Sequence, residues 1–192
     1  MAHPDWFNAP VPSFGDEQAR LLIVGLAPGL QGANRTGRPF TGDYAGELLY
    51  RTLLDTGFAE GEYRADPNDG LRLKTCLITN AVRCVPPANK PTAAEIKSCR
   101  PFLCGRIAAL PQLRAILALG RVAHDSVIAA RDGRQADYRF AHGACHALPD
   151  GLRVYDSYHC SRYNTNTGRL TEQMFQAVLE RIRGDLGIVT AP

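Results

Sequence analysis

The sequence of 192 residues has no apolar stretch that approaches the roughly 20 residues needed to span a membrane. Its first residues, Met1–Trp6, also lack the basic segment and the apolar core of a secretory signal peptide. We therefore expect a cytoplasmic protein with no membrane partner. Because cytoplasmic thiols stay reduced, the six cysteines are expected to be core residues or metal ligands rather than disulfides.

The sequence also has little net charge, no internal repeat and no low-complexity linker. The formal charge is +3, so any contact with a nucleic acid would have to come from a local basic patch. With 45% hydrophobic and 21% charged residues, the chain can bury a core, and we expect one domain over residues 1–192. Residues 1–20 are rich in proline, glycine and polar residues and are expected to form an irregular lead-in.

Short apolar runs alternate with amphipathic segments along the chain. Strands are expected at 21–24, 75–80, 115–119 and 152–158, and helices at 44–56, after Thr92, at 121–131 and at 169–183. Thr92 and Glu95 have the spacing of a capping box. The alternation predicts an α/β fold with a parallel sheet covered on both faces. Ligands of such sheets bind beyond the carboxyl ends of the strands, which directs attention to the loops after Val24, Asn80 and Tyr158.

The first of these loops contains Gly25–Gly29 and Gly32–Asp43 and is rich in glycine without being a known phosphate-binding loop. No Gly-Lys-Ser/Thr follows the strand, and Pro28 removes one backbone N–H that a phosphate cradle would use. We expect the loop to bring backbone close to a flat ligand, with Phe40 as a stacking face. A surface loop with a core phenylalanine is an equally good interpretation of the composition alone.

The second and third loops begin with polar side chains at strand ends. The amide of Asn80 can offer one donor and one acceptor to the edge of a pyrimidine, although capping a turn is the commoner role of such an asparagine. A lone histidine is usually structural. His159, however, ends an apolar strand and precedes a loop of basic and hydrogen-bonding residues, which makes it a better active-site candidate than most.

In this order the three segments resemble the uracil-DNA glycosylase superfamily, and most closely family five, a broad-specificity branch related to the iron–sulfur enzymes of family four. The motifs that carry the resemblance are Gly-Leu-Ala-Pro-Gly with Asn-Arg-Thr-Gly-Arg-Pro-Phe-Thr-Gly-Asp, then Asn-Ala-Val-Arg-Cys-Val-Pro-Pro-Ala-Asn-Lys-Pro-Thr, then His-Cys-Ser-Arg-Tyr-Asn-Thr. The similarity runs from about residue 10 to about residue 183.

The resemblance implies a three-layer α/β/α sandwich with a central four-stranded parallel sheet. It also implies a DNA-repair enzyme that flips uracil and other deaminated bases out of DNA and hydrolyses the N-glycosidic bond. DNA that contains such bases is the expected partner, and the protein is expected to act as a monomer. No nucleotide cofactor is expected.

The resemblance further implies roles for residues at matching positions. The expected catalytic groups are His159, which stabilises charge on the departing base, and Asp43, which assists hydrolysis. The expected contacts to the base are Leu26, Ala27, Gly29, Phe40, Asn80 and Asn89, and the motif does not choose between the two asparagines. The expected contacts to DNA are Arg35, Arg38, Ser161, Arg162, Tyr163 and Asn164. Many superfamily members have an acidic residue or asparagine directly after the glycine of the first strand, whereas Leu26 stands there, as in family five.

Families four and five resemble each other in a four-cysteine iron–sulfur site, and Cys84 and Cys99 match its last two metal ligands. The first two ligands should form a close pair well before Gly25, but the first cysteine in this sequence is Cys76. Two of the four ligands of the expected 4Fe-4S cluster are therefore missing. Either the chain is N-terminally short or this member lacks the cluster. Cys104 is a conceivable substitute, but a plain buried thiol is the more common role.

Two other function classes are compatible with an α/β fold. A nucleotide-binding or phosphotransferase enzyme would need a phosphate-loop lysine and a pair of metal-binding carboxylates, and the loop after Val24 has neither. A non-catalytic binder of damaged DNA would keep the pocket and lose the catalytic groups. The presence of both His159 and Asp43 argues against it.

Overall fold

Four short apolar runs form the parallel centre of the sheet, as the sequence predicted. The structure is a computed structural model that describes residues 3–188. The parallel strands are β2 (Leu21–Gly25), β5 (Cys76–Asn80), β6 (Ala115–Leu119) and β8 (Arg153–Ser157), in the spatial order β5-β2-β6-β8. Every residue of β2, β5 and β6 is buried, because helices cover both faces of the sheet and leave no solvent side.

The sheet has six strands rather than the four expected. β1 (Phe14–Gly15) pairs antiparallel with β5 at one edge, and β7 (Cys145–Ala147) pairs antiparallel with β8 at the other. A separate two-stranded sheet consists of β3 (Ala59–Glu60) and β4 (Arg72–Leu73). These strands of two or three residues are too short to show a periodic pattern, so the sequence did not predict them. β1 also gives structure to a segment within residues 1–20, which had been expected to be irregular throughout.

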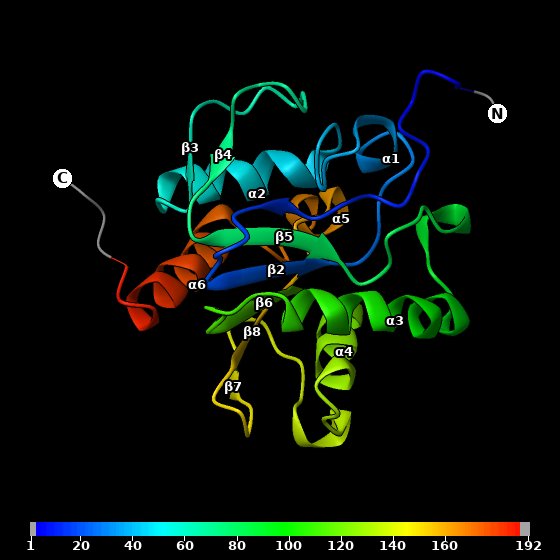
Figure 1. The fold of residues 1–192 in the computed structure, drawn as a ribbon. Helices are drawn as coiled ribbons and strands as arrows, with labels where there is room; N and C mark the ends of the chain where they lie inside the picture. The colour runs from blue at the N-terminus through cyan, green and yellow to red at the C-terminus, as the bar shows by residue number, and fades with distance from the viewer. Residues whose placement is uncertain (1–2, 189–192) are drawn as a thin grey trace.

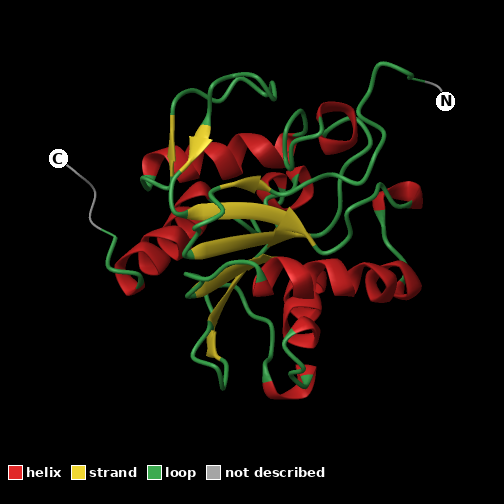
Figure 2. Ribbon diagram, in the orientation of Figure 1, coloured by secondary structure: helices red, strands yellow, loops and turns green. Residues whose placement is uncertain are grey.

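Helices lie on both sides of the sheet and form the outer two of the three expected layers (Figures 1 and 2). The helical elements are α1 (Ala33–Thr36), α2 (Tyr44–Asp55), η1 (Pro87–Asn89), α3 (Ala93–Ala108), α4 (Arg121–Ala130), η2 (Gln135–Asp137), α5 (Arg162–Asn166) and α6 (Glu172–Asp185). The layer of α2 and α6 packs on Leu21 and Ile23 of β2, and the layer of α3 and α4 packs on Leu22 and Val24. Successive strand residues point to opposite faces, so one apolar run supplies two cores.

Local hydrogen bonds explain where the helices begin. The capping box at α3 is confirmed: the N–H of Thr92 donates to Glu95 at 2.7 Å, and the N–H of Glu95 donates to the Thr92 hydroxyl at 3.2 Å. α6 begins at Glu172, three residues later than predicted, because the Thr171 hydroxyl caps it by accepting from the N–H of Met174. α1 and α5 are short helices inside segments that the sequence analysis treated as loops.

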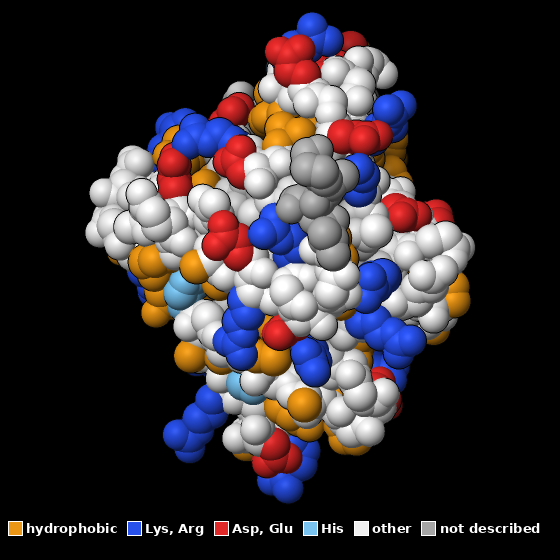
Figure 3. All heavy atoms as spheres, turned by 90° about the vertical axis from the view of Figure 1, so that its left-hand side faces the viewer, with side chains coloured by type: hydrophobic (Ala, Val, Ile, Leu, Met, Phe, Trp, Pro, Cys, Tyr) orange, Lys and Arg blue, Asp and Glu red, His pale blue; other side chains and the backbone are white. Residues whose placement is uncertain are grey.

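The parallel strands β2 and β5 run toward the right of Figure 1, so their carboxyl ends lie on that side. Figure 3 views the molecule from the opposite side, where the strands begin, and there lysine and arginine side chains alternate with aspartate and glutamate. This face therefore offers no patch of a single sign of charge. Within residues 3–188, no helix combines the length and the apolar character that crossing a membrane would require.

Arg38 is buried in the loop before α2, where it holds that loop against the segment before β4. Its guanidinium donates two hydrogen bonds of 2.8 Å to Asp69, and its Nε donates to the Thr41 hydroxyl at 2.7 Å. Burial alone would raise the pKa of Asp69, but Arg38 and the N–H groups of Arg64 and Leu71 lower it. The sequence predicted a DNA contact for Arg38. That prediction is wrong, because the guanidinium faces inward and is engaged by the protein.

Replacing Arg38 by methionine should lower the free energy of unfolding by about 3–5 kcal/mol, since the Asp69 carboxylate would stay buried without a partner. Urea denaturation at neutral pH measures the change. The matched control is Arg51→Met, which breaks an ion pair with Glu172 in which both side chains are 62% exposed. That control should cost less than about 1 kcal/mol. Equal losses in the two variants would contradict a structural role for the buried pair.

Candidate active site

The three segments singled out in the sequence meet at the carboxyl edge of the sheet. Gly25, the last residue of β2, pairs in register with Asn80, the last residue of β5. The pairing continues past both strands, since the N–H of Ala81 donates to the Gly25 carbonyl at 2.9 Å. β6 is followed by Gly120, where a Cβ would lie 3.4 Å from the Cβ of His159 beyond β8. The parallel topology thus gathers residues that are up to 134 positions apart in the sequence.

Phe40 and Asn80 meet at Gly25 because Gly25 has no side chain. A Cβ placed there would lie 2.4 Å from the Asn80 Oδ1 and 2.5 Å from the Phe40 ring. The Phe40 ring also stacks against the imidazole of His159, with centroids 5.9 Å apart and planes inclined by 30°. The site therefore brings an amide, an aromatic ring and an imidazole close together. Phe40 is buried, as a core phenylalanine would be, and it also belongs to this site.

The backbone at Phe40 is held in an unusual conformation. Its φ is +56°, in the left-handed region that residues other than glycine rarely adopt. The Phe40 carbonyl accepts from the Tyr63 hydroxyl at 3.3 Å and lies only 1.8 Å from where a Cβ of Gly46 would be. Helix α2 therefore needs a glycine at that point. Strain of this kind costs about 1–3 kcal/mol and concentrates at functional sites.

Asn80 carries a buried hydrogen-bond acceptor that the protein does not satisfy. Among residues 3–188, no donor reaches its Oδ1, although the residue is only 6% exposed. Such an unpaired acceptor costs about 1–3 kcal/mol, and a ligand with an N–H group would relieve it. Asn89 lies elsewhere, exposed at the end of η1. Of the two asparagines between which the motif could not choose, Asn80 is the one that lies beside Gly25 and near the Phe40 ring.

His159 is held as a neutral imidazole. Burial lowers its pKa to about 4, because the imidazolium form would lose its hydration. At neutral pH the ring therefore has one N–H donor and one acceptor nitrogen. The Asn164 side chain donates to the backbone carbonyl of His159 at 2.8 Å, which ties the histidine to the start of α5. Asn164, predicted to contact DNA, is thus turned toward His159.

The two carboxylate oxygens of Asp43 have different surroundings. One carboxylate oxygen caps α2 by accepting from the N–H of Gly46 at 3.3 Å. The other faces the glycine-rich loop, 3.3 Å from a Cβ position on Gly29 and 2.4 Å from one on Gly32. Burial raises the pKa of Asp43, and the N–H groups of Gly46 and Ala45 offset part of that effect. The oxygen that faces the loop is available to a ligand or a water molecule.

The backbone after β2 offers further donors. The Leu26 carbonyl accepts from the N–H of Val82 at 3.0 Å, which extends the contact between the first and second segments. The Gly29 carbonyl accepts from the N–H of Gly32 and helps close the loop. Within the described part of the chain, the N–H groups of Leu26 and Ala27 donate to no protein acceptor. They are therefore free to bind an oxygen at this edge of the sheet.

The predicted DNA contacts lie mostly on the surface beside this site. Ser161 caps α5, and Tyr163 on that helix is 72% exposed, the most exposed large apolar side chain of the described residues. The guanidinium of Arg162 lies 5.0 Å from the centre of the Tyr44 ring. Arg35 is exposed on α1 and donates to the Gln31 carbonyl. Helix α5 thus presents an aromatic and a basic side chain shortly after His159.

Two arginines that were not expected from the sequence, Arg121 and Arg169, lie next to His159. A cavity of about 440 Å³ is lined by Gly120, Arg121, Phe140, Ala141, Tyr158, His159, Asn164 and Arg169. Arg121 stacks on Phe140 at 5.6 Å and Arg169 stacks on Tyr158 at 4.5 Å. Among the described residues neither forms an ion pair with a carboxylate, so both charges are open to an anion. Arg121 is the second residue after β6, at the start of α4, and its place near a strand end was the signal that could have identified it.

A larger cavity, of about 690 Å³, has none of Asn80, Phe40 and His159 in its lining. Its lining includes Leu48 and Leu54 of α2, together with the carboxylates of Glu47, Glu62 and Glu172. Acidic side chains repel a phosphate backbone. We therefore take the convergence of Asn80, Phe40 and His159, rather than cavity size, as the mark of the candidate site.

The cysteines do not assemble a cluster within the described residues. Cys84 is exposed, Cys99 is half-buried, and the Cys104 thiol donates to the Ala130 carbonyl at 3.5 Å. Over residues 3–188, no third histidine, cysteine or carboxylate ligand joins Cys84 and Cys99 at close range. A cubane cluster normally takes four cysteines. The residues present therefore do not fit a 4Fe-4S cluster by themselves.

Comparison with known proteins agrees with this geometry. The sequence model of the "Uracil DNA glycosylase superfamily" matches residues 12–183. A "Type-5 uracil-DNA glycosylase" of Thermus thermophilus is 47% identical over 176 residues, which cover 92% of this chain and 80% of the relative. A Type-5 enzyme of Pyrobaculum aerophilum is 41% identical over 182 residues, with 95% and 79% covered. A "Type-4 uracil-DNA glycosylase" of the same organism is 34% identical over 128 residues, with 66% and 57% covered.

Replacing Gly25 by alanine should disrupt the site, because the new Cβ would overlap the Asn80 amide and the Phe40 ring. Overpacking of this kind typically costs about 1–3 kcal/mol of stability, measurable by urea denaturation. The matched control is Gly105→Ala on α3, where a Cβ meets nothing within 4 Å. In a helix that exchange should stabilise by about 0.5–1 kcal/mol. A Gly25→Ala protein as stable as the control would show that the site is looser than described.

The 192-residue chain, purified anaerobically, should contain far less than one iron–sulfur cluster per molecule, because Cys84 and Cys99 supply only two ligands. Iron and sulfide analysis, together with absorbance of the thiolate-to-iron band, measures the content. A stoichiometric cluster would refute the missing-ligand argument. It would then direct attention to a local thiol such as Cys104.

Proposed function

Because this chain belongs to the uracil-DNA glycosylase superfamily, we propose that it is a DNA-repair glycosylase that flips uracil out of DNA and hydrolyses the N-glycosidic bond. The observation that supports this most directly is the unsatisfied Oδ1 of Asn80, buried beside the Phe40 ring at the carboxyl edge of the sheet. An amide next to an aromatic face suits a flat base with hydrogen-bonding groups on its edge.

In this proposal Asn80 reads the edge of the base. Its Oδ1 accepts from the N3–H of uracil, and its amide N–H donates to O4. Cytosine presents the opposite pattern, an acceptor at N3 and a donor at N4, so it would leave both atoms of the buried amide unpaired. Phe40 stacks on the base and contributes about 1–3 kcal/mol. Other deaminated bases that place an N–H beside a carbonyl suit the same amide.

The proposed catalysis follows from the negative charge that develops on the departing base. When the glycosidic bond breaks, the base keeps the electron pair and negative charge grows on its O2. His159 donates its N–H there as a neutral imidazole, and the free N–H groups of Leu26 and Ala27 add further donors. One such donor typically lowers the barrier by about 2.7–4 kcal/mol. With Leu26 in place of an acidic residue, leaving-group stabilisation is the main contribution.

Asp43 completes the hydrolysis in this proposal. Its oxygen on the side of Gly29 and Gly32 orients the water whose oxygen bonds to C1′ of the sugar, and the carboxylate accepts the proton that the water loses. The raised pKa of Asp43 makes it a better proton acceptor than an exposed aspartate. While ionised, it also stabilises the positive charge that develops on the sugar.

The proposed DNA interface surrounds the base pocket. Arg162 and Tyr163 on α5 enter the duplex, where they offset part of the few kcal/mol that flipping costs. Arg35, Arg121 and Arg169 contact phosphates, since none of them pairs with a carboxylate among the described residues. We propose that the protein acts as a single domain over residues 1–192, as a monomer and in the cytoplasm.

The proposal is tested by single-turnover release of uracil from a U·G duplex. Asn80→Ala and His159→Ala should each reduce the rate at least about tenfold, because each removes a group used by the base or by the departing charge. Asn89→Ala is the matched control and should leave the rate within about twofold. Duplex binding should change little in all three variants. Binding without release in the parent protein would favour a damage-binding function instead.

The same assay tests the state of His159. Since burial lowers its pKa to about 4, the ring is neutral at every pH above about 5. The parent rate should therefore show no inflection near pH 6.5, the ordinary pKa of histidine. An activity that falls as the pH rises through 6.5 would mean that the imidazolium form is the donor.

A further inference from the structure

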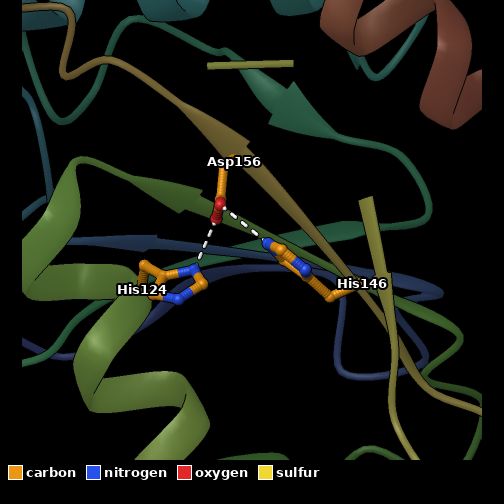
Figure 4. Close-up of side chains that lie close together, drawn as sticks. All are labelled: His124, His146 and Asp156. Atoms are coloured by element: carbon orange, nitrogen blue, oxygen red, sulfur yellow. Dashed lines mark hydrogen bonds and ion pairs between the residues drawn. The ribbon is translucent and has the colours of Figure 1, made fainter. Parts of the chain in front are cut away.

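A second cluster of titratable side chains lies outside the candidate active site. His124 on α4, His146 on β7 and Asp156 on β8 each place one ligand atom within 4.8 Å of the other two, and Figure 4 shows both imidazoles turned toward the carboxylate. His124 and Asp156 are fully buried, and the His146 side chain is 15% exposed. Within residues 3–188 no other such group of three was found.

The hydrogen bonds of His124 determine which of its ring nitrogens carries a hydrogen. Its Nε2 lies 2.8 Å from the Tyr138 carbonyl oxygen, which can only accept, so Nε2 carries the hydrogen. Its Nδ1 lies 2.7 Å from Oδ1 of Asp156, which is also an acceptor when ionised. Two acceptors in contact require a cation between them. That cation is either a proton or a metal ion.

We propose that this position binds a divalent transition-metal ion of the zinc type, with His124 Nδ1, His146 Nε2 and the Asp156 carboxylate as ligands. Two imidazoles and one carboxylate are a donor set that such ions prefer. The Tyr138 carbonyl then fixes the tautomer of His124, as outer partners of metal-binding histidines do. The N–H of Ala141, 3.3 Å from Asp156 Oδ2, supports the carboxylate in the same way.

The two spacings between histidine and aspartate are close to what an ion needs, and the two imidazole nitrogens lie within 4.8 Å of each other. With metal–ligand bonds of about 2.0–2.1 Å, neighbouring ligand atoms of a tetrahedral site lie roughly 3.3 Å apart. His146 Nε2 and Asp156 Oδ2 are 3.1 Å apart. The 2.7 Å between His124 Nδ1 and Asp156 Oδ1 must open by roughly half an ångström. The partly exposed side of His146 gives the ion a way in, and water would be the fourth ligand.

The proposed ion would have a structural effect. Its three ligands come from α4, β7 and β8, so binding would join the edge hairpin to the helix on one face of the sheet. No site preformed in this way exists in the unfolded chain, and the free energy of binding therefore stabilises the fold.

The experiment uses the full chain after removal of metals with a chelator, with Co²⁺ as a spectroscopic probe and Zn²⁺ for thermal unfolding. We expect one Co²⁺ per chain with d–d absorption and no thiolate charge-transfer band, and a Tm that rises with Zn²⁺. His146→Ala should abolish both responses. A Cys84→Ser, Cys99→Ser double variant should retain them, which separates the site from exposed thiols.

A second measurement needs no variant. Nitrogen-15 NMR of the parent protein should show that the proton on His124 Nδ1 disappears when Zn²⁺ is added. Persistence of that proton at saturating Zn²⁺ would overturn the proposal and assign the cluster to a buried imidazolium–carboxylate pair. Cobalt binding that survives in His146→Ala but is lost in the cysteine double variant would overturn it as well.

Discussion

The position of Phe40 depends on one buried ion pair. Arg38 joins its own loop to Asp69, and its guanidinium also lies 5.1 Å from the Phe14 ring and 5.3 Å from the Tyr50 ring. The pair therefore connects the loop with β1 and α2. A buried ion pair adds little net stability over an apolar replacement, but it strongly penalises conformations that separate its partners. Here it specifies a loop that must hold Phe40 at positive φ.

The candidate site depends on two glycines, whose lack of a side chain lets other groups come close together. Gly25 lets the Asn80 amide and the Phe40 ring come together, and Gly46 lets the Phe40 carbonyl pack on α2. The surface next to the site is joined to it: Asn164 of α5 bonds to the His159 backbone, and Arg162 stacks on the residue that follows Asp43. A movement of α5 would therefore reach both proposed catalytic groups through short, direct contacts.

The central part of the fold was predictable because it depends on local signals. Buried parallel strands appear as continuous apolar runs, and Thr92 with Glu95 marks a helix start within a few residues. The edge strands β1 and β7 lack such signals because they contain two and three residues. Their pairing depends on neighbours that are distant in the sequence.

The same contrast holds for the site. The strand ends and the family motifs singled out Asn80, Phe40 and His159 as candidates, and the structure brings these three close together. The choice between Asn80 and Asn89 required knowledge of burial. Arg38 resembled a surface arginine because its partner, Asp69, lies 31 residues further along the chain. Orientation inward or outward is a property of the folded chain, and a short motif does not encode it.

The unpaired oxygen of Asn80 lowers the stability of the ligand-free fold, and in the proposed function it also recognises the base. A residue such as leucine at this position would remove the buried acceptor, and the ligand-free protein would gain part of the roughly 1–3 kcal/mol that the acceptor costs. In the proposed function it would also lose the group that distinguishes one base edge from another. Selection for that discrimination would hold this chain below the stability that its fold allows, and substitutions of Asn80 for heat tolerance would then conflict with base recognition.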